Sequence, residues 1–296
     1  MRKTTLVAAG AALVLTLTAC SGNAATGTAQ PAGANGQSQA DGGSGLASPF
    51  TDAIKLASAS KQGTEKSKSA KFTMESSVGG QSMTASGAMS FDGANTKMSM
   101  TSSAAGQETE IRILDGAFYI KMPAEQAKQL GSGKQWIKFA PGGDDPFSQM
   151  LGSSSQSAEQ SDPSKILDQV SKTGRIVSSD QTELNGQKVN HYVVEMDVAK
   201  SVDEFTKSMP EATRAKVAET LKGKDVKIPA EFWLDKDNLP VQVTMDQGPL
   251  MQAMGVPGAD SSKFTMKYTD WGTQVDVVAP PADQVADLGE LLKGGR

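Results

Sequence analysis

The stretch KFTMESSVGGQSMTASGAMSF, residues 71–91, decides the fold of this chain. Its apolar side chains fall at every second position on either side of a Gly-Gly pair: Phe72, Met74 and Val78, then Met83, Ala85, Met89 and Phe91. Side chains two positions apart lie on the same face of a β-strand, and an apolar face opposite a polar one is typical of antiparallel sheets. The stretch therefore predicts a β-hairpin with one apolar face.

The same period continues to about residue 122 and returns after residue 175. Dipeptides that favour tight hairpin turns separate several of the runs, namely Gly79-Gly80, Asp92-Gly93, Asp115-Gly116 and Asn185-Gly186. Strands joined in this way pair with their neighbours in sequence, so the pattern predicts a meander. A further short strand is expected at 275–278.

Helical periodicity interrupts the strands in a few places. Helices are expected at 49–66, 123–130 and 163–173, and a helix broken at Pro210 is expected over 202–222. The predicted fold class is α+β. We expect one curved antiparallel sheet, an unclosed half-barrel of about 10–11 strands, covered by helices around an apolar cavity.

The apolar face of this sheet is rich in methionine. The chain has 14 Met against 9 Phe, and Met adapts to irregular apolar shapes better than branched side chains do. The small residues Ala85, Gly87 and Ala88 beside these Met residues suggest a face that its own side chains do not fill, although packing under the helices explains any single Met equally well. The predicted cavity-lining residues are Phe72, Met74, Met83, Met89, Phe91, Met98, Met100, Ile111, Ile113, Phe118, Ile120, Tyr192, Val194, Met196, Phe232, Leu234, Val243, Met245, Phe264 and Met266.

A Gly- and Pro-rich segment at 248–260 carries further apolar side chains, including Leu250, Met251 and Met254. Two interpretations remain open. The segment forms a mouth or membrane contact of the cavity, or it folds down on its own sheet.

Cys20 is the one cysteine of the chain and closes the run Leu17, Thr18, Ala19, Cys20. It follows a basic start and roughly 12 apolar residues, fewer than the about 20 that span a bilayer core. This pattern resembles the lipobox of bacterial lipoproteins, in which the cysteine is acylated and becomes the mature N-terminus. We therefore expect a lipoprotein signal peptide at 1–19 and a lipid-anchored protein on the extracytoplasmic face of the cell membrane.

Residues 20–45 are almost wholly small and polar, which predicts a disordered membrane tether ahead of a single domain at 46–296. A flexible coil of about 25 residues has a root-mean-square reach of roughly 25–30 Å. The net charge is −4, and loss of Arg2 and Lys3 with the signal peptide would make it −6. The chain has no basic run, so no nucleic-acid partner is expected, and the acyl anchor would supply the membrane contact.

Motifs for catalysis are missing from the sequence. It contains no Gly-x-Ser-x-Gly elbow, no His-Glu-x-x-His pair and no phosphate-binding glycine loop. The single histidine, His191, alternates with Tyr192 and is expected on the polar face of its strand. We therefore expect no enzyme activity, catalytic residue, metal site or cofactor.

Several short motifs resemble the actinobacterial LppX/LprAFG lipoprotein family. They are Tyr268-Thr269-Asp270-Trp271-Gly272 with 275–281, Trp136-Ile137, the helix at 163–170, Gly186 before His191, and 232–237 before Leu239-Pro240. The resemblance covers about 46–290 and implies a half-barrel related to the LolA and LolB lipid carriers, with an apolar cavity for acylated lipids or glycolipids. This chain departs from the family in its Ser-rich segment at 152–162 and in its Met-rich face.

Together these features predict an envelope lipoprotein that binds an acylated lipid or glycolipid and transfers it across the envelope. The alternative is an envelope scaffold or sensor that acts through protein contacts with an unidentified partner.

Overall fold

The computed structural model describes residues 45–91, 96–129, 133–139, 163–198, 200, 202, 211–256, 258 and 261–287. The predicted signal peptide, Cys20, nearly all of the tether, the Asp92-Gly93 turn and the break at Pro210 lie outside these residues. Predictions about them therefore stay predictions. The described residues all belong to one compact unit, 44–296.

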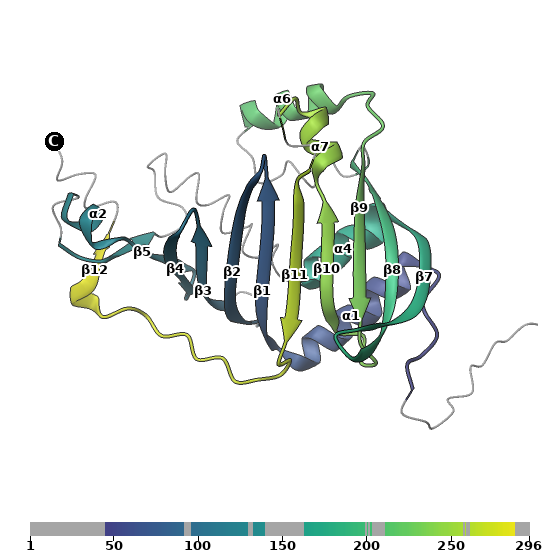
Figure 1. Cartoon of the computed structure of the whole chain (residues 1–296), viewed down its shortest axis with the longest axis horizontal. Coiled ribbons are helices and arrows are strands. Elements are labelled where there is room, and N and C mark those ends of the chain that lie inside the picture. The colour runs from purple at the N-terminus through teal and green to yellow at the C-terminus, as the bar shows by residue number, and fades with distance from the viewer. Residues whose placement is uncertain are drawn as a thin grey trace, which may run out of the picture. The chain divides into compact units, whose positions relative to one another are not determined.

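Twelve strands form one unclosed sheet in the described part of the chain (Figure 1). Their order across the sheet is β12-β6-β5-β4-β3-β2-β1-β11-β10-β9-β8-β7. The strands are β1 Ser69–Val78, β2 Gln81–Ser90, β3 Lys97–Ala104, β4 Gln107–Leu114, β5 Ala117–Lys121, β6 Trp136–Phe139, β7 Gly174–Leu184, β8 Gln187–Asp197, β9 Lys227–Leu234, β10 Pro240–Asp246, β11 Lys263–Thr269 and β12 Val285–Asp287. The predicted half-barrel of antiparallel strands is confirmed.

The predicted tight turns at Gly79-Gly80, Asp115-Gly116 and Asn185-Gly186 join the strands as expected. Asn185 and Gly186 between β7 and β8 have φ angles of 53° and 80°, and Asp115 and Gly116 between β4 and β5 have φ angles of 52° and 70°. Two successive positive φ angles define the turn type whose twist matches that of the flanking strands. The turn residues therefore set the register of both hairpins.

The last strand differs from the prediction. Residues 275–278 form no strand but belong to an extended connection that follows β11, and the chain then pairs β12 with β6 in parallel. The pairing is parallel because the connection carries the chain along the sheet from β11 to β6 before β12 begins (Figure 1). A short 3-10 turn, Ala282–Gln284, precedes β12.

Two helices, α1 and α4, cover one face of the sheet, and both contact β7 (Figure 1). We call this face the inner face and the opposite one the outer face. The helices also contact each other, and α4 contacts β8. The described helices are α1 Ala53–Ser67, α2 Ala124–Gln129, α4 Pro163–Thr173, α6 Glu211–Leu221 and α7 Gly248–Ala253. The helix expected at 163–173 is confirmed with the same ends, and those expected at 49–66 and 123–130 are confirmed with shifted ends.

The start of α1 is set by Asp52. Its Oδ1 accepts hydrogen bonds from the backbone N–H groups of Ile54 and Lys55, both at 3.0 Å. These are two of the first N–H groups of the helix, which have no partner within the helix itself.

Replacing Asp52 with alanine is expected to lower the free energy of unfolding by about 1 kcal/mol, because both N–H groups lose their acceptor. Chemical denaturation followed by circular dichroism measures the change. Asp52→Asn is the control, since its side-chain oxygen still accepts, and it should retain most of the stability. Equal losses in the free energy of unfolding for both variants would show that the hydrogen bonds to the Asp52 side chain do not stabilise α1.

Candidate apolar binding face

The inner face gathers nearly all of the predicted cavity-lining residues into one apolar cluster. Of these residues, all but Met83 are buried in the cluster or packed against it, together with Leu56 of α1 and Leu167 of α4. Met83 is 36% exposed near the start of β2. The two-residue alternation therefore identified side chains that share one face of the sheet, and their role as a ligand lining stays a prediction.

Cross-strand pairing aligns these side chains in rows. Met74 pairs with Met266, Met266 with Val243, and Val243 with Phe232. A second row runs through Met100, Ile111 and Ile120. Directly opposed residues have their Cβ atoms about 4.5–5.5 Å apart, so each row is a continuous apolar strip.

The β7–β9 half of the inner face is filled. Tyr192, Val194, Phe232 and Leu234 are each 0% exposed. Phe50, just before α1, stacks on Tyr192 with ring centroids 6.5 Å apart, and its backbone N–H donates to the Tyr192 hydroxyl at 3.2 Å. Burial raises the pKa of the Tyr192 phenol, and this hydrogen bond opposes the rise.

The β1–β5 half of the inner face is less completely covered. Met74, Met100, Ile111 and Ile120 are half-buried and pack against the cluster. We call these four residues the Met100 patch. Met245 and Phe264 continue the half-buried surface onto β10 and β11. The apolar side chains of the patch therefore still reach solvent, as do those of Met83, Phe91, Met245 and Phe264 elsewhere in the predicted lining.

The small residues on β2 differ in the face they lie on and in what surrounds them. A Cβ on Gly87 would lie 2.2 Å from the Ser99 carbonyl oxygen and 2.9 Å from Cζ of Phe72. The Phe72 ring therefore occupies the space that the missing side chain leaves, and Gly87 does not mark an empty pocket. Ala85 is buried on the inner face, whereas Ala88 has the opposite parity and belongs to the outer face.

The segment predicted as a mouth loop begins with a helix, α7, rather than an irregular loop. Leu250 is 2% exposed and packs in a second apolar cluster with Val217 and Leu221 of α6. Met254 packs against this cluster, and Met251 is half-buried. The position of Leu250 fits the interpretation of a segment folded down on its own domain. A mouth role for Met251 and Met254 stays a prediction.

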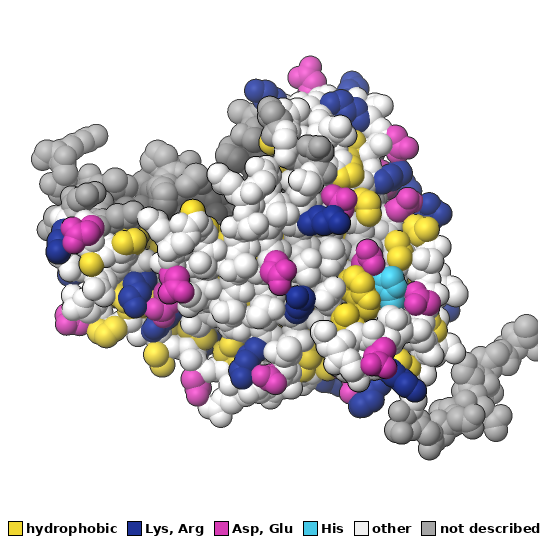
Figure 2. Space-filling view, in the orientation of Figure 1, with side chains coloured by type: hydrophobic (Ala, Val, Ile, Leu, Met, Phe, Trp, Pro, Cys, Tyr) yellow, Lys and Arg dark blue, Asp and Glu magenta, His cyan; other side chains and the backbone are white. Residues whose placement is uncertain are grey.

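The outer face carries His191, as its parity predicts (Figure 2). Its Nδ1 lies 3.0 Å from Oδ1 of Asp180 and its Nε2 lies 2.8 Å from Oε2 of Glu231. The ring stacks on Trp233, with centroids 4.7 Å apart. His191 is therefore a bridging residue across β7, β8 and β9. Within the described residues no group of His, Cys, Asp and Glu is arranged to hold a metal ion.

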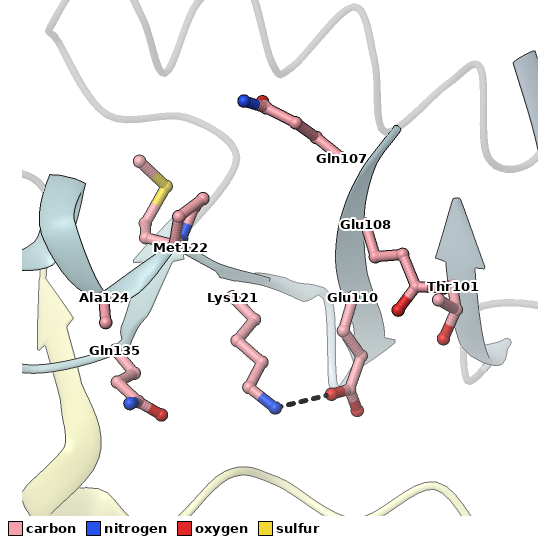
Figure 3. A pocket seen from close by; sticks show the side chains of 9 residues that line it. Thr101, Gln107, Glu108, Glu110, Lys121, Met122, Ala124 and Gln135 are labelled. Atoms are coloured by element: carbon pink, nitrogen blue, oxygen red, sulfur yellow. Dashed lines mark hydrogen bonds and ion pairs between the residues drawn. The ribbon is translucent and has the colours of Figure 1, made fainter. Parts of the chain in front are cut away.

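A hollow of about 500 Å³ lies on the outer face, where β4 and β5 approach α2 (Figure 3). Glu110 and Lys121 lie at its centre, with Nζ of Lys121 3.3 Å from Oε2 of Glu110. Arg112 binds the other oxygen of Glu110 at 3.0 Å through Nε and at 2.6 Å through Nη2. This hollow was not predicted from the sequence. Glu108, Glu110 and Arg112 alternate along β4, and this charged pattern indicates the face on which the hollow lies.

The charged neighbours of Glu110 alter its protonation. Partial burial alone raises its pKa, but the hydrogen bonds and positive charges of Arg112 and Lys121 outweigh burial and lower the pKa below the ordinary value. Because the folded-state pKa lies below that of the unfolded chain, Glu110 stabilises the fold above the ordinary glutamate pKa of about 4.3. This contribution disappears as the pH falls through the lowered folded-state value.

Replacing Glu110 with glutamine is therefore expected to reduce stability at pH 7, and the difference from the native chain should shrink below about pH 4. Urea denaturation at both pH values measures it. Glu108→Gln removes a neighbouring exposed carboxylate that forms no ion pair among the described residues, and it should change stability by less than about 0.5 kcal/mol. A loss of stability for Glu110→Gln that is the same at both pH values would contradict a lowered pKa of Glu110 in the folded state.

The fold and the inner face define an open half-barrel with an apolar face partly covered by helices. No model of a known family matches the chain. A Streptomyces griseus protein described as an uncharacterized 31.2 kDa protein in the rplA-rplJ intergenic region is 25% identical over 191 residues. The match covers 63% of this chain and 58% of that relative, so the chain spans little more than half of its length.

Two solved structures are similar to part of this chain. MucB in complex with MucA(peri) has a TM-score of 0.36 and 12% identity, covering 78% of this chain and 59% of that one. A DUF1329 family protein from Desulfovibrio piger has a TM-score of 0.25 and 14% identity, covering 74% of this chain and 92% of that one. The half-barrel implied by the sequence resemblance rests on the strand order of this chain, and membership of the LppX/LprAFG family stays a prediction. No described helix is long and apolar enough to cross a membrane.

Proposed function

We propose that this protein is an envelope lipoprotein, anchored by an acylated Cys20, that binds the acyl chain of a lipid or glycolipid at the Met100 patch. The observation that carries the proposal is the half-buried row of Met100, Ile111 and Ile120 on the less completely covered half of the inner face. Soluble proteins bury such rows unless a partner covers them.

The patch suits a flexible hydrocarbon chain. Each methylene moved from water into an apolar site contributes about 0.8 kcal/mol, and no directional contact is needed. Methionine side chains adjust to chains of different shape. The predicted tether, with a reach of roughly 25–30 Å, would keep the domain close to the membrane, where lipid can enter and leave.

The described N-terminal segment leaves the patch accessible. The Ala47 carbonyl oxygen accepts hydrogen bonds from Nε2 of Gln181 at 2.9 Å and from Nδ2 of Asn190 at 3.1 Å. The segment is thus fixed to β7 and β8, whereas the patch lies on β1 and β3–β5 at the other side of β11. The chain can therefore be tethered from one part of the sheet and load lipid at another.

Lipid copurification tests the proposal. The chain is exported from a bacterial host with Cys20→Ser and a cleavable secretory signal in place of residues 1–19, so that no acyl chain is attached covalently. Native mass spectrometry and solvent extraction of the purified protein should then reveal one bound lipid per chain. A mass without ligand from several hosts would contradict the proposal.

The scaffold alternative also has a structural observation in its favour. On the β7–β9 half of the inner face, Tyr192, Val194, Phe232 and Leu234 have no exposed surface, as expected for a domain without ligand. A lipid-free mass, together with stable capture of one envelope protein at defined stoichiometry, would favour this second function.

A further inference from the structure

The outer-face hollow is a second, chemically different cavity. Its lining comes from β3, β4, β5, the start of α2 and the residue before β6. The side chains that define it are Thr101, Glu108, Glu110, Lys121, Met122 and Gln135. Thr101, Glu110 and Lys121 alternate with Met100, Ile111 and Ile120, so the hollow and the Met100 patch lie on opposite faces of the same strands.

The centre of the hollow is held rigidly. Arg112 and Lys121 fix both oxygens of Glu110. Arg112 in turn lies 4.7 Å above the ring of Trp136, which is 5% exposed, and donates from Nη1 to the Val278 carbonyl oxygen at 3.0 Å. A charged group that is fixed before binding loses little conformational entropy when a ligand arrives.

The remaining polar groups are available to a ligand. The side chains of Gln107, Glu108 and Gln135 are exposed and form no hydrogen bond or ion pair among the described residues. Figure 3 shows Glu108 beside Thr101, and Gln135 on the other side of Lys121. Amides and hydroxyls both donate and accept hydrogen bonds, carboxylates accept, and ammonium groups donate. The hollow thus offers donors and acceptors in comparable numbers.

We propose that this hollow binds a neutral sugar ring of a polyhydroxylated ligand. Each sugar hydroxyl donates and accepts a hydrogen bond, which matches the mixed lining, while Met122, Pro123 and Ala124 supply an apolar wall for the C–H face of a ring. A volume of about 500 Å³ lies within the usual range for small-molecule sites.

The surface next to the hollow is consistent with this ligand. The outer face over β2 and β3 shows few charged side chains (Figure 2), and the next charged group along it is the ion pair of Glu75 and Lys267 on β1 and β11. Hydroxyl side chains on β2 and β3, including Thr84, Ser86 and Thr101, have outward parity there. Glu108 and Glu110 are balanced by Lys121 and the adjoining Arg112, so the site carries no net charge and suits a neutral ligand. An extended glycan could therefore continue from the hollow across these hydroxyls.

Titration of the purified full chain with N-acetylglucosamine, methyl glucoside and maltotriose tests the site. Two-dimensional NMR should show saturable shifts in the side-chain amides of Gln107 and Gln135 for at least one sugar, with a Kd of about 1 mM. Glu108→Ala and Gln135→Ala should each weaken binding about tenfold. Thr182→Ala, an exposed change on β7 at the far side of the sheet from the hollow, is the matched control and should bind normally.

Two results would overturn the inference: no saturable shift with any of the three sugars, or equal binding by putrescine at the same residues, which would indicate an amine site. Met100→Trp, on the opposite face, should leave sugar binding unchanged. Failure of lipid binding and failure of sugar binding are thus independent results.

Discussion

Replacing Met100 with tryptophan is expected to reduce copurified lipid at least about tenfold while leaving the fold intact. Met100 is half-buried in the middle of the row formed with Ile111 and Ile120. The larger indole would occupy the surface on which the acyl chain is proposed to lie. Because this position still reaches solvent, the free energy of unfolding should change by less than about 1 kcal/mol. Lipid extraction and thermal denaturation of the same sample measure both effects.

A matched variant separates blocking from a general effect of tryptophan. Ser86 is exposed on β2 with outward parity, and Ser86→Trp should retain the lipid. Met89 is a poor site for the same test, since it is 2% exposed and a tryptophan there would disturb the core. Unchanged lipid content in a folded Met100→Trp protein would show that the ligand does not lie on the Met100 patch.

Replacing Gly87 with alanine is expected to lower the free energy of unfolding by about 3 kcal/mol. The added Cβ would lie 2.2 Å from the Ser99 carbonyl oxygen, a backbone atom, and 2.9 Å from the Phe72 ring. Relief requires β2 and β3 to move apart or Phe72 to leave its position. Either movement disturbs the cluster that joins the two halves of the inner face.

Urea denaturation measures the loss, and the neighbouring change Ser86→Ala provides the comparison. Ser86 is exposed on the outer face, so its replacement should alter stability by less than about 0.5 kcal/mol. Similar small effects at both positions would mean that the strands accommodate the methyl group. A second change, Phe72→Leu, should partly restore Gly87→Ala if the ring contact is a main cause.

Much of the sheet could be predicted because its signals are local. Alternation around Phe72 and Met74 identifies the inner face, and Asn185-Gly186 specifies its own turn. α4 could be predicted for the same reason, because Ile166, Leu167 and Val170 repeat with helical spacing. All three are buried in the structure. A strand or helix pattern needs only neighbours in sequence to be visible.

Features that depend on distant residues were missed or misassigned. α7 forms where Leu250 packs with α6, about 30 residues away, and periodicity within its six residues does not reveal that contact. β12 has three residues and exists because β6 offers an unpaired edge. The outer-face hollow joins Glu110, Lys121 and Gln135 from different elements.

The small residues of β2 show most clearly which features follow from the sequence alone and which depend on the tertiary structure. By itself, the sequence determined that residues 71–91 form a hairpin with an apolar inner face, because side-chain direction alternates with every residue. It could not determine whether the space beside Gly87 is empty or filled. Only the tertiary structure decided this, since it places the Phe72 ring over Gly87 and leaves Met100 partly exposed. Packing depends on how distant side chains meet in three dimensions, whereas the strand pattern depends on the backbone alone.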